Sequence, residues 1–340
     1  MKKILRSDLP ALFSAISAGK QLYIPADDPT GQAKFTLWQE GVALSEKLNT
    51  VRSAKDLFFP QVENIVNFKV SGKKMEILER NDDVQAFAVF GVRACDCRSF
   101  DILDSVFLSE PVDTFYKTRR ENGTVITMAC SRPAETCFCG AFGIDAADPK
   151  GDVTCWADET WLYWRANTQK GEALTDSLVI LQECGEDAAD VVKENTRKIL
   201  NKLPLNGLDL SGFESEKLME LFSSDVWGEL SESCLGCGTC TFVCPTCQCY
   251  DVQDFDNGRE VCRFRCWDSC MYSDFTMMAH GTNRPTQKER FRQRFMHKLV
   301  YYPSNNNGVF GCVGCGRCLQ KCPIHMNIVK VAKKLKEAAK

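Results

Sequence analysis

The chain has 340 residues, of which 44% are hydrophobic and 26% are charged, so it has the composition of an ordinary globular protein with room for two or three domains. Its 42 basic and 45 acidic residues leave a net charge of −3, which speaks against nucleic-acid binding and against binding to a membrane surface. It has no run of about 18 apolar residues and no signal-peptide core near its start, so we expect a cytoplasmic protein without a membrane span.

Cysteine is the unusual component, with 20 residues against 3 histidines. In a reducing compartment such a count indicates metal binding rather than disulfides. Thirteen cysteines lie from Cys234 onward and seven lie before it. This asymmetry predicts a cluster-bearing domain at residues 211–340 and a different domain at residues 1–210, with the boundary in the turn-rich segment 204–212.

The first half of the chain predicts strands and helices in alternation, which favours an α/β or α+β domain. Segment 53–64 holds apolar residues without a clear period and is expected to be a packed loop and turn. Strands are expected at 21–26, 34–39, 68–70, 75–78, 85–92 and 123–130, a hairpin at 153–166, and helices at 2–20, 99–108, 112–120 and 187–203.

The two most apolar strands, 85–92 and 123–130, lead directly into cysteines. Ligand sites in open α/β sheets lie at the carboxyl ends of strands, so we predict a third 4Fe-4S cluster there. The alternative is that these cysteines are small buried hydrophobic residues, as we expect for Cys155 and Cys184. The predicted ligands are Cys95, Cys130, Cys137 and Cys139, with Cys97 as the substitute.

Two cysteine runs in the second half follow the pattern C-x2-C-x2-C-x3-C-P, which is typical of bacterial ferredoxins. Three thiolates on one tight turn reach three irons of one cluster, and the fourth cysteine of each run ligates the other cluster. A pair of zinc sites fits eight cysteines in duplicated triplets poorly. The predicted sets are Cys234, Cys237 and Cys240 with Cys322, and Cys312, Cys315 and Cys318 with Cys244.

Around these runs the sequence predicts helices at 214–230, 284–300 and 326–338, and hence a mainly α-helical, ferredoxin-like dicluster domain. The helix at 284–300 is basic, which fits cations beside anionic clusters, an acidic partner surface or a solvated face. Five cysteines between the runs have no standard spacing, and they either pack against the clusters or bind a further metal: Cys247, Cys249, Cys262, Cys266 and Cys270.

Several motifs are absent from the sequence. It has no G-x-G-x-x-G after a strand, no G-x4-G-K-[ST] and no C-x2-C-H haem attachment. No histidine stands in a triad-like pattern. We therefore expect no catalytic residue and no flavin or nucleotide bound by this chain.

The motifs together resemble a known family. They are Gly-Val-Arg-Ala-Cys95-Asp, Glu-Thr-Cys137-Phe-Cys139, Cys-Pro-Thr-Cys-Gln-Cys249, Arg-Cys-Trp-Asp-Ser-Cys270, Arg-Gln-Arg-Phe-Met-His-Lys-Leu and Cys-Val-Gly-Cys-Gly-Arg-Cys318. This set is similar to the 4Fe-4S dicluster family. Its members include the iron–sulfur β subunits of cytoplasmic sulfhydrogenase-type NiFe hydrogenases, the iron–sulfur subunits of anaerobic sulfite reductases and subunits paired with heterodisulfide reductase modules.

The resemblance implies an electron relay in an anaerobic, cytoplasmic oxidoreductase complex. One partner would be a subunit that oxidises NAD(P)H with FAD and a 2Fe-2S centre. The other would be a terminal hydrogenase or heterodisulfide-reductase-like subunit. The alternatives are the iron–sulfur subunit of an anaerobic sulfite reductase, which would pair with a sulfite-reductase subunit, and a self-contained iron–sulfur reductase.

Overall fold

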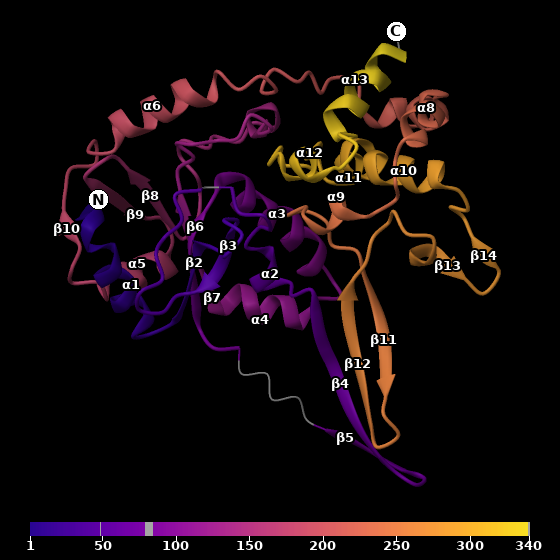
Figure 1. Ribbon diagram of the computed structural model, residues 1–340, viewed down its shortest axis with the longest axis horizontal. Coiled ribbons are helices and arrows are strands. Elements are labelled where there is room, and N and C mark those ends of the chain that lie inside the picture. Colours follow the sequence, from indigo (N-terminus) through magenta and orange to yellow (C-terminus); the bar gives the residue numbers. More distant parts are fainter. Residues whose placement is uncertain (48, 79–83, 339–340) are drawn as a thin grey trace.

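The computed structural model describes residues 1–47, 49–78 and 84–338. Its largest unit is an eight-stranded sheet in the order β10-β1-β9-β8-β7-β6-β2-β3 (Figure 1). The neighbours β2, β6, β7 and β8 run parallel and the other pairs run antiparallel. The strands are β1 (Lys2–Leu5), β2 (Gln21–Asp27), β3 (Ala33–Leu37), β6 (Phe87–Val92), β7 (Gly123–Met128), β8 (Val153–Ala157), β9 (Trp161–Ala166) and β10 (Gln182–Glu183).

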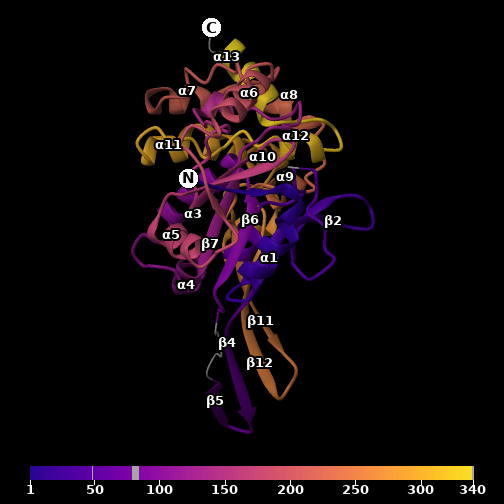
Figure 2. The same ribbon diagram turned by 90° about the vertical axis from the view of Figure 1, so that its left-hand side faces the viewer.

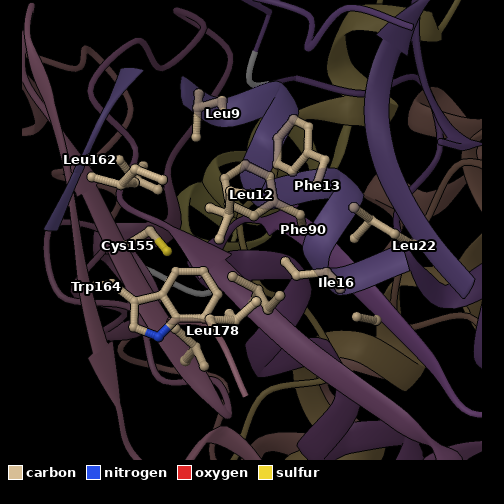
Figure 3. Close-up of a cluster of buried hydrophobic side chains, with 14 of the residues drawn as sticks. Leu9, Leu12, Phe13, Ile16, Leu22, Phe90, Cys155, Leu162, Trp164 and Leu178 are labelled. Atoms are coloured by element: carbon tan, nitrogen blue, oxygen red, sulfur yellow. The ribbon is translucent and has the colours of Figure 1, made fainter. Parts of the chain in front are cut away.

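Helices pack against both faces of this sheet. One face is covered by α1 (Leu9–Ser17) and α5 (Gln169–Asp176), whose apolar side chains join those of the strands in one core (Figure 3). The other face is covered by α2 (Lys55–Phe58), α3 (Ala94–Phe107), α4 (Thr114–Asn122) and α6 (Asp190–Leu200).

The two cores follow from the alternation of side chains along each strand. On β6, Phe90 points to the α1 face and Val89 to the α3 face. Both residues are fully buried, as expected for a parallel strand that is covered on both sides. Cys155 packs beside Trp164 in the first core, so its prediction as a core residue is confirmed (Figure 3). Cys184 is only partly buried, because it lies at the end of the edge strand β10.

A second sheet, in the order β11-β12-β4-β5, projects from the body as an arm (Figures 1 and 2). Its strands are β4 (Val62–Ser71), β5 (Lys74–Leu78), β11 (Tyr250–Asp256) and β12 (Glu260–Trp267). Because β12 pairs with β4, the arm joins the two halves of the chain. The domain boundary at 204–212 stays a prediction.

The C-terminal part contributes β11 and β12 to the arm. Its short helices lie around the cysteine runs. Its helices are α7 (Leu218–Ser223), α8 (Val226–Glu232), α9 (Thr239–Phe242), α10 (Gln287–Met296), α11 (Tyr302–Asn305), α12 (Arg317–Lys321), α13 (Ile328–Ala338) and the π-helix η5 (His297–Tyr301). The small remaining elements are β13 (Met277–Met278), β14 (Gly281–Thr282) and the 3-10 helices η1 (Arg6–Asp8), η2 (Cys139–Phe142), η3 (Ser215–Lys217) and η4 (Asp274–Thr276).

Four predictions of local structure need correction. Residues 2–5 form a strand rather than the start of a helix, because they pair with β9 and β10. Segment 53–64 contains α2 and the beginning of β4. The helix expected at 99–108 starts at Ala94, and the one expected at 214–230 is divided into η3, α7 and α8. In the described part of the chain, no helix is long and apolar enough to cross a membrane.

Candidate metal centres

The first cysteine run forms a loop that leads into α9. Gly236 and Gly238 have φ angles of 63° and 70°, and such left-handed backbone suits glycine and lets the loop turn tightly. The pKa of Cys234 is raised by burial and by nearby thiols. These neighbours include Cys237, Cys240 and Cys322. The structure thus brings together the four cysteines of the first predicted set.

The second run repeats this loop before α12. Gly314 and Gly316 have φ angles of 59° and 76°, at the same positions between the cysteines as the glycines of the first run. A cavity beside the loop is lined by all four cysteines of the second predicted set, Cys244, Cys312, Cys315 and Cys318. Cys244 comes from the first run, so the fold places the fourth cysteine of one run beside the first three cysteines of the other.

The third predicted site lies at the carboxyl ends of β6 and β7. Cys130 follows β7, and burial together with the thiols of Cys130 and Cys137 raises the pKa of Cys139 to about 12. Cys95 lies in the first turn of α3, just after the end of β6 at Val92. It belongs to the same buried group as Cys130, Cys139 and Cys315. The four cysteines therefore share one region.

Arg93 lies among the thiols of the third site. Its side chain is buried, and its Nε and Nη2 atoms have no hydrogen-bond partner in the described structure. The groups that raise its pKa are Cys95, Asp96, Cys130 and Cys137, against an opposing effect of burial. A buried guanidinium with unused donors is costly unless an anionic group balances it, so this site fits a thiolate-bound cluster.

Cys97, the substitute for the third set, points elsewhere. Its thiol donates a hydrogen bond to the carbonyl oxygen of Lys150. Burial raises its pKa to about 12, and the charged groups acting on it include Asp101 and Arg120. The helix α3 turns Cys97 away from Cys95, because residues two apart on a helix do not share a face.

Three of the five off-pattern cysteines lie close to another thiol. Cys247 lies within hydrogen-bond distance of Cys244. Cys249 accepts hydrogen bonds from the backbone N–H and the thiol of Cys270, and this lowers its pKa to about 7. The remaining two lie on β12 of the arm: Cys262 and Cys266.

The second and third sites are in direct contact. The backbone N–H of Phe138 donates to the carbonyl oxygen of Gly314 at 2.8 Å, and the thiol of Cys137 lies 3.8 Å from the carbonyl oxygen of Cys315. A Cβ atom on Gly314 would lie 2.4 Å from the Phe138 carbonyl oxygen. Glycine is therefore required at this position for two reasons, the positive φ and the close approach of the third-site loop.

Arg294 and Lys298 belong to the basic helix expected at 284–300. They line the cavity beside the second cysteine loop, together with its cysteines. Both side chains are buried, and one guanidinium nitrogen of Arg294 has no partner among the described residues. The expectation of cations beside the cysteine runs is therefore confirmed for this helix. Two buried cations were not predicted from the sequence, Arg93 and Lys55. The Lys55 ammonium donates to the carbonyl oxygens of Cys244 and Cys247. Only the position of Arg93 two residues before Cys95 hinted at its role.

Within the described residues, no group of three or more cysteine, histidine or acidic side chains is arranged to hold a single metal ion. A cubane with four irons holds its thiolates farther apart than one ion does. The finding therefore bears on single-ion sites alone.

Comparison with known proteins agrees with this geometry. The model of the 4Fe-4S dicluster domain matches residues 233–326, which include both cysteine runs. The chain is 36% identical over 273 residues to the sulfhydrogenase 2 subunit beta of Pyrococcus furiosus, and the match covers 79% of each chain. No solved structure matches the chain significantly.

The match to the sulfhydrogenase subunit extends well beyond the 94 residues of the domain model, so the relationship includes much of the N-terminal half. The cysteine loops, the cavity beside the second loop and the buried cations all agree with cluster binding. The chain therefore belongs to the 4Fe-4S dicluster family and is an iron–sulfur electron-transfer protein.

Proposed function

We propose that this chain is the relay subunit of an anaerobic, cytoplasmic oxidoreductase complex and that it holds three 4Fe-4S clusters. Each bound cluster supplies one-electron transfer, and the chain positions and insulates it. The proposed ligand sets are Cys234, Cys237, Cys240 and Cys322 for the first cluster, Cys312, Cys315, Cys318 and Cys244 for the second, and Cys95, Cys130, Cys137 and Cys139 for the third.

The observation that carries this proposal is the unbroken series of contacts between the three cysteine groups. The third group touches the second through Phe138 and Gly314. Arg294 joins the second cysteine group to the first, because it lines the cavity of the second site and donates to the Sγ of Cys240 in the first. These contacts support a relay in the order third, second, first.

The partners follow from the relative. It is named as part of a sulfhydrogenase, which supports a terminal hydrogenase subunit for one side of the relay. A heterodisulfide-reductase-like subunit is the second candidate for that position. We propose an FAD- and 2Fe-2S-containing subunit that oxidises NAD(P)H for the other side, since this chain has no nucleotide-binding motif of its own. In this arrangement the chain contributes no catalytic residue and binds no flavin.

The number of clusters can be measured directly. Three clusters require about twelve iron atoms per chain, and the two ferredoxin-type clusters alone require about eight. A purified chain with about eight iron atoms would contradict the third cluster. Flavin retained by the isolated chain would contradict the division of labour between subunits.

A cysteine variant tests the relay. We expect Cys315→Ser to lose about four iron atoms and to uncouple NAD(P)H oxidation from the terminal acceptor in the purified complex. The matched control is Cys184→Ser, which changes a partly buried cysteine outside the three sets and should keep both iron and coupling. Undiminished coupled activity in Cys315→Ser would refute the relay.

A further inference from the structure

Arg294 and Lys298 are one helical turn apart at the junction of α10 and the π-helix η5. Positions i and i+4 of a helix share a face, so both side chains point toward the cysteine loops. Only 2% of Arg294 and 5% of Lys298 are exposed to solvent. Two long cationic side chains at this depth need a specific reason.

Arg294 reaches both ferredoxin-type sites. Its Nε donates to the Sγ of Cys240 at 2.9 Å, and its Nη2 donates to the carbonyl oxygen of the same residue at 2.9 Å. Its Nη1 is buried and has no hydrogen-bond partner among the residues described. The guanidinium also lines the cavity of the second site with Cys244 and Cys318. One cation is therefore shared between the two predicted clusters.

Lys298 acts on the second site alone. Its ammonium donates to the hydroxyl oxygen of Thr246 at 2.7 Å and to the carbonyl oxygen of Gly311 at 2.9 Å. The Thr246 hydroxyl in turn lies 3.2 Å from the Sγ of Cys244. Lys298 thus lies beside the second set at two points. Thr246 connects it to Cys244, and Gly311 directly precedes Cys312.

Neither cation has a carboxylate within ion-pair distance in the described part of the chain. The ionisable groups that raise their pKa values are mainly cysteines, Cys240 and Cys318 for Arg294 and Cys244 and Cys247 for Lys298. A buried charge without a counter-charge destabilises the folded state. Neutral thiols do not repay this cost, whereas an anionic cluster on the same cysteines does.

We propose that Arg294 and Lys298 set the reduction potentials of the two ferredoxin-type clusters, with Arg294 acting on both and Lys298 on the second. A nearby cation stabilises the more negative, reduced form of a cluster and so raises its reduction potential. Arg294 and Lys298 are positioning residues for electron transfer, because they hold charge beside the clusters and ligate no iron. This inference rests on the proposed function, since it needs both clusters to be present.

The test is a redox titration of the cluster-loaded full-length chain, followed by electron paramagnetic resonance. We expect Arg294→Gln to lower the potentials of both clusters, and Lys298→Gln to lower mainly that of the second. A tenfold change in the one-electron reduction equilibrium corresponds to a shift of about 59 mV, and we expect shifts of about this size. Parallel titrations in a Cys315→Ser background identify the signal of the second cluster.

Two variants control for the loss of charge and for the loss of hydrogen bonds. Lys288→Gln removes one positive charge from the exposed side of α10 and should leave both potentials unchanged. Arg294→Lys keeps the charge and should keep both potentials near those of the wild type. If Arg294→Gln loses iron, the Lys298→Gln titration still tests the charge role at the second cluster, where an unchanged potential would contradict it.

Two results would overturn the inference. One is that Arg294→Gln and Lys298→Gln hold their clusters at wild-type potentials. The other is that Arg294→Lys shifts the potentials as much as Arg294→Gln, because the effect would then come from geometry rather than charge. The iron content of the wild-type chain separates this failure from a failure of the proposed function, which would appear as missing clusters.

Discussion

Buried cations at the base of the arm and buried cations beside the cysteine runs have different partners in this molecule. At the base of the arm, Arg265 pairs with Glu63 and Asp113, and Arg119 also reaches Glu63. Beside the runs, Arg294 and Lys298 face sulfur atoms and no carboxylate among the described residues. The polypeptide itself neutralises Arg265 and Arg119, whereas Arg294 and Lys298 need a counter-charge that the described residues do not supply.

The difference shows how a buried cation can indicate either stability or cofactor binding. A carboxylate partner makes the charge part of the folded scaffold, and Arg265 joins strand β12 to the N-terminal half in this way. A cation that faces only thiols is balanced when those thiols are ionised as cluster ligands and is unbalanced when they are neutral. The two regions should therefore respond differently when iron is removed, when a carboxylate partner is lost and when pH changes.

Removal of iron should have the largest effect. An anaerobic chelator that strips the clusters leaves Arg294 and Lys298 without counter-charges, and each such buried ion costs several kcal/mol. We expect amide hydrogen exchange to accelerate strongly in 287–301 and to stay slow in the arm strands at 62–71 and 260–267. Equal acceleration in both regions would show that the distinction between them is wrong.

Loss of the arm cation should have an intermediate effect. Arg265→Met removes the cation that lies between Glu63 and Asp113, and breaking a buried ion pair typically costs about 3–5 kcal/mol. We expect a decrease in the free energy of unfolding near the lower end of this range, about 3 kcal/mol, because Arg119 still pairs with Glu63. Urea unfolding measures this value. Iron content should remain that of the wild type, and a loss of iron would place the arm base in the cluster region.

The smallest effect concerns His297, which lies next to Lys298. Burial, with the positive charges of Lys298 and Arg284, lowers its pKa from 6.5 to about 4. The unfolded chain therefore binds a proton that the folded chain rejects between these pH values. The contribution of His297 to stability is complete above pH 6.5 and is lost as the pH falls toward 4.

Urea unfolding of the full chain between pH 4.5 and 7 measures this dependence. We expect His297→Gln to have a flatter stability profile than the wild type in this range, because glutamine does not titrate. Identical profiles for the two proteins would show that His297 is not responsible. Replacement of the exposed His280 by glutamine is the matched control and should retain the wild-type profile.

Much of the fold was predictable because its signals are local. The apolar segments 85–92 and 123–130 are confirmed as the buried parallel strands β6 and β7. The basic helix at 284–300 is confirmed as α10 and η5. The strand β1 and the hairpin β11–β12 were not predicted, because each depends on a partner strand far away in the sequence.

The sequence by itself determined the family and the two cysteine runs, since the spacing of three thiols on one turn is a property of adjacent residues. Only the tertiary structure decided which groups surround those thiols. It brings Arg93 and Cys137 together, joins Gly314 to Phe138, and turns Arg294 and Lys298 inward. Charge in a low-dielectric interior acts over several ångströms whatever the distance along the chain, and spacing in the sequence does not record it.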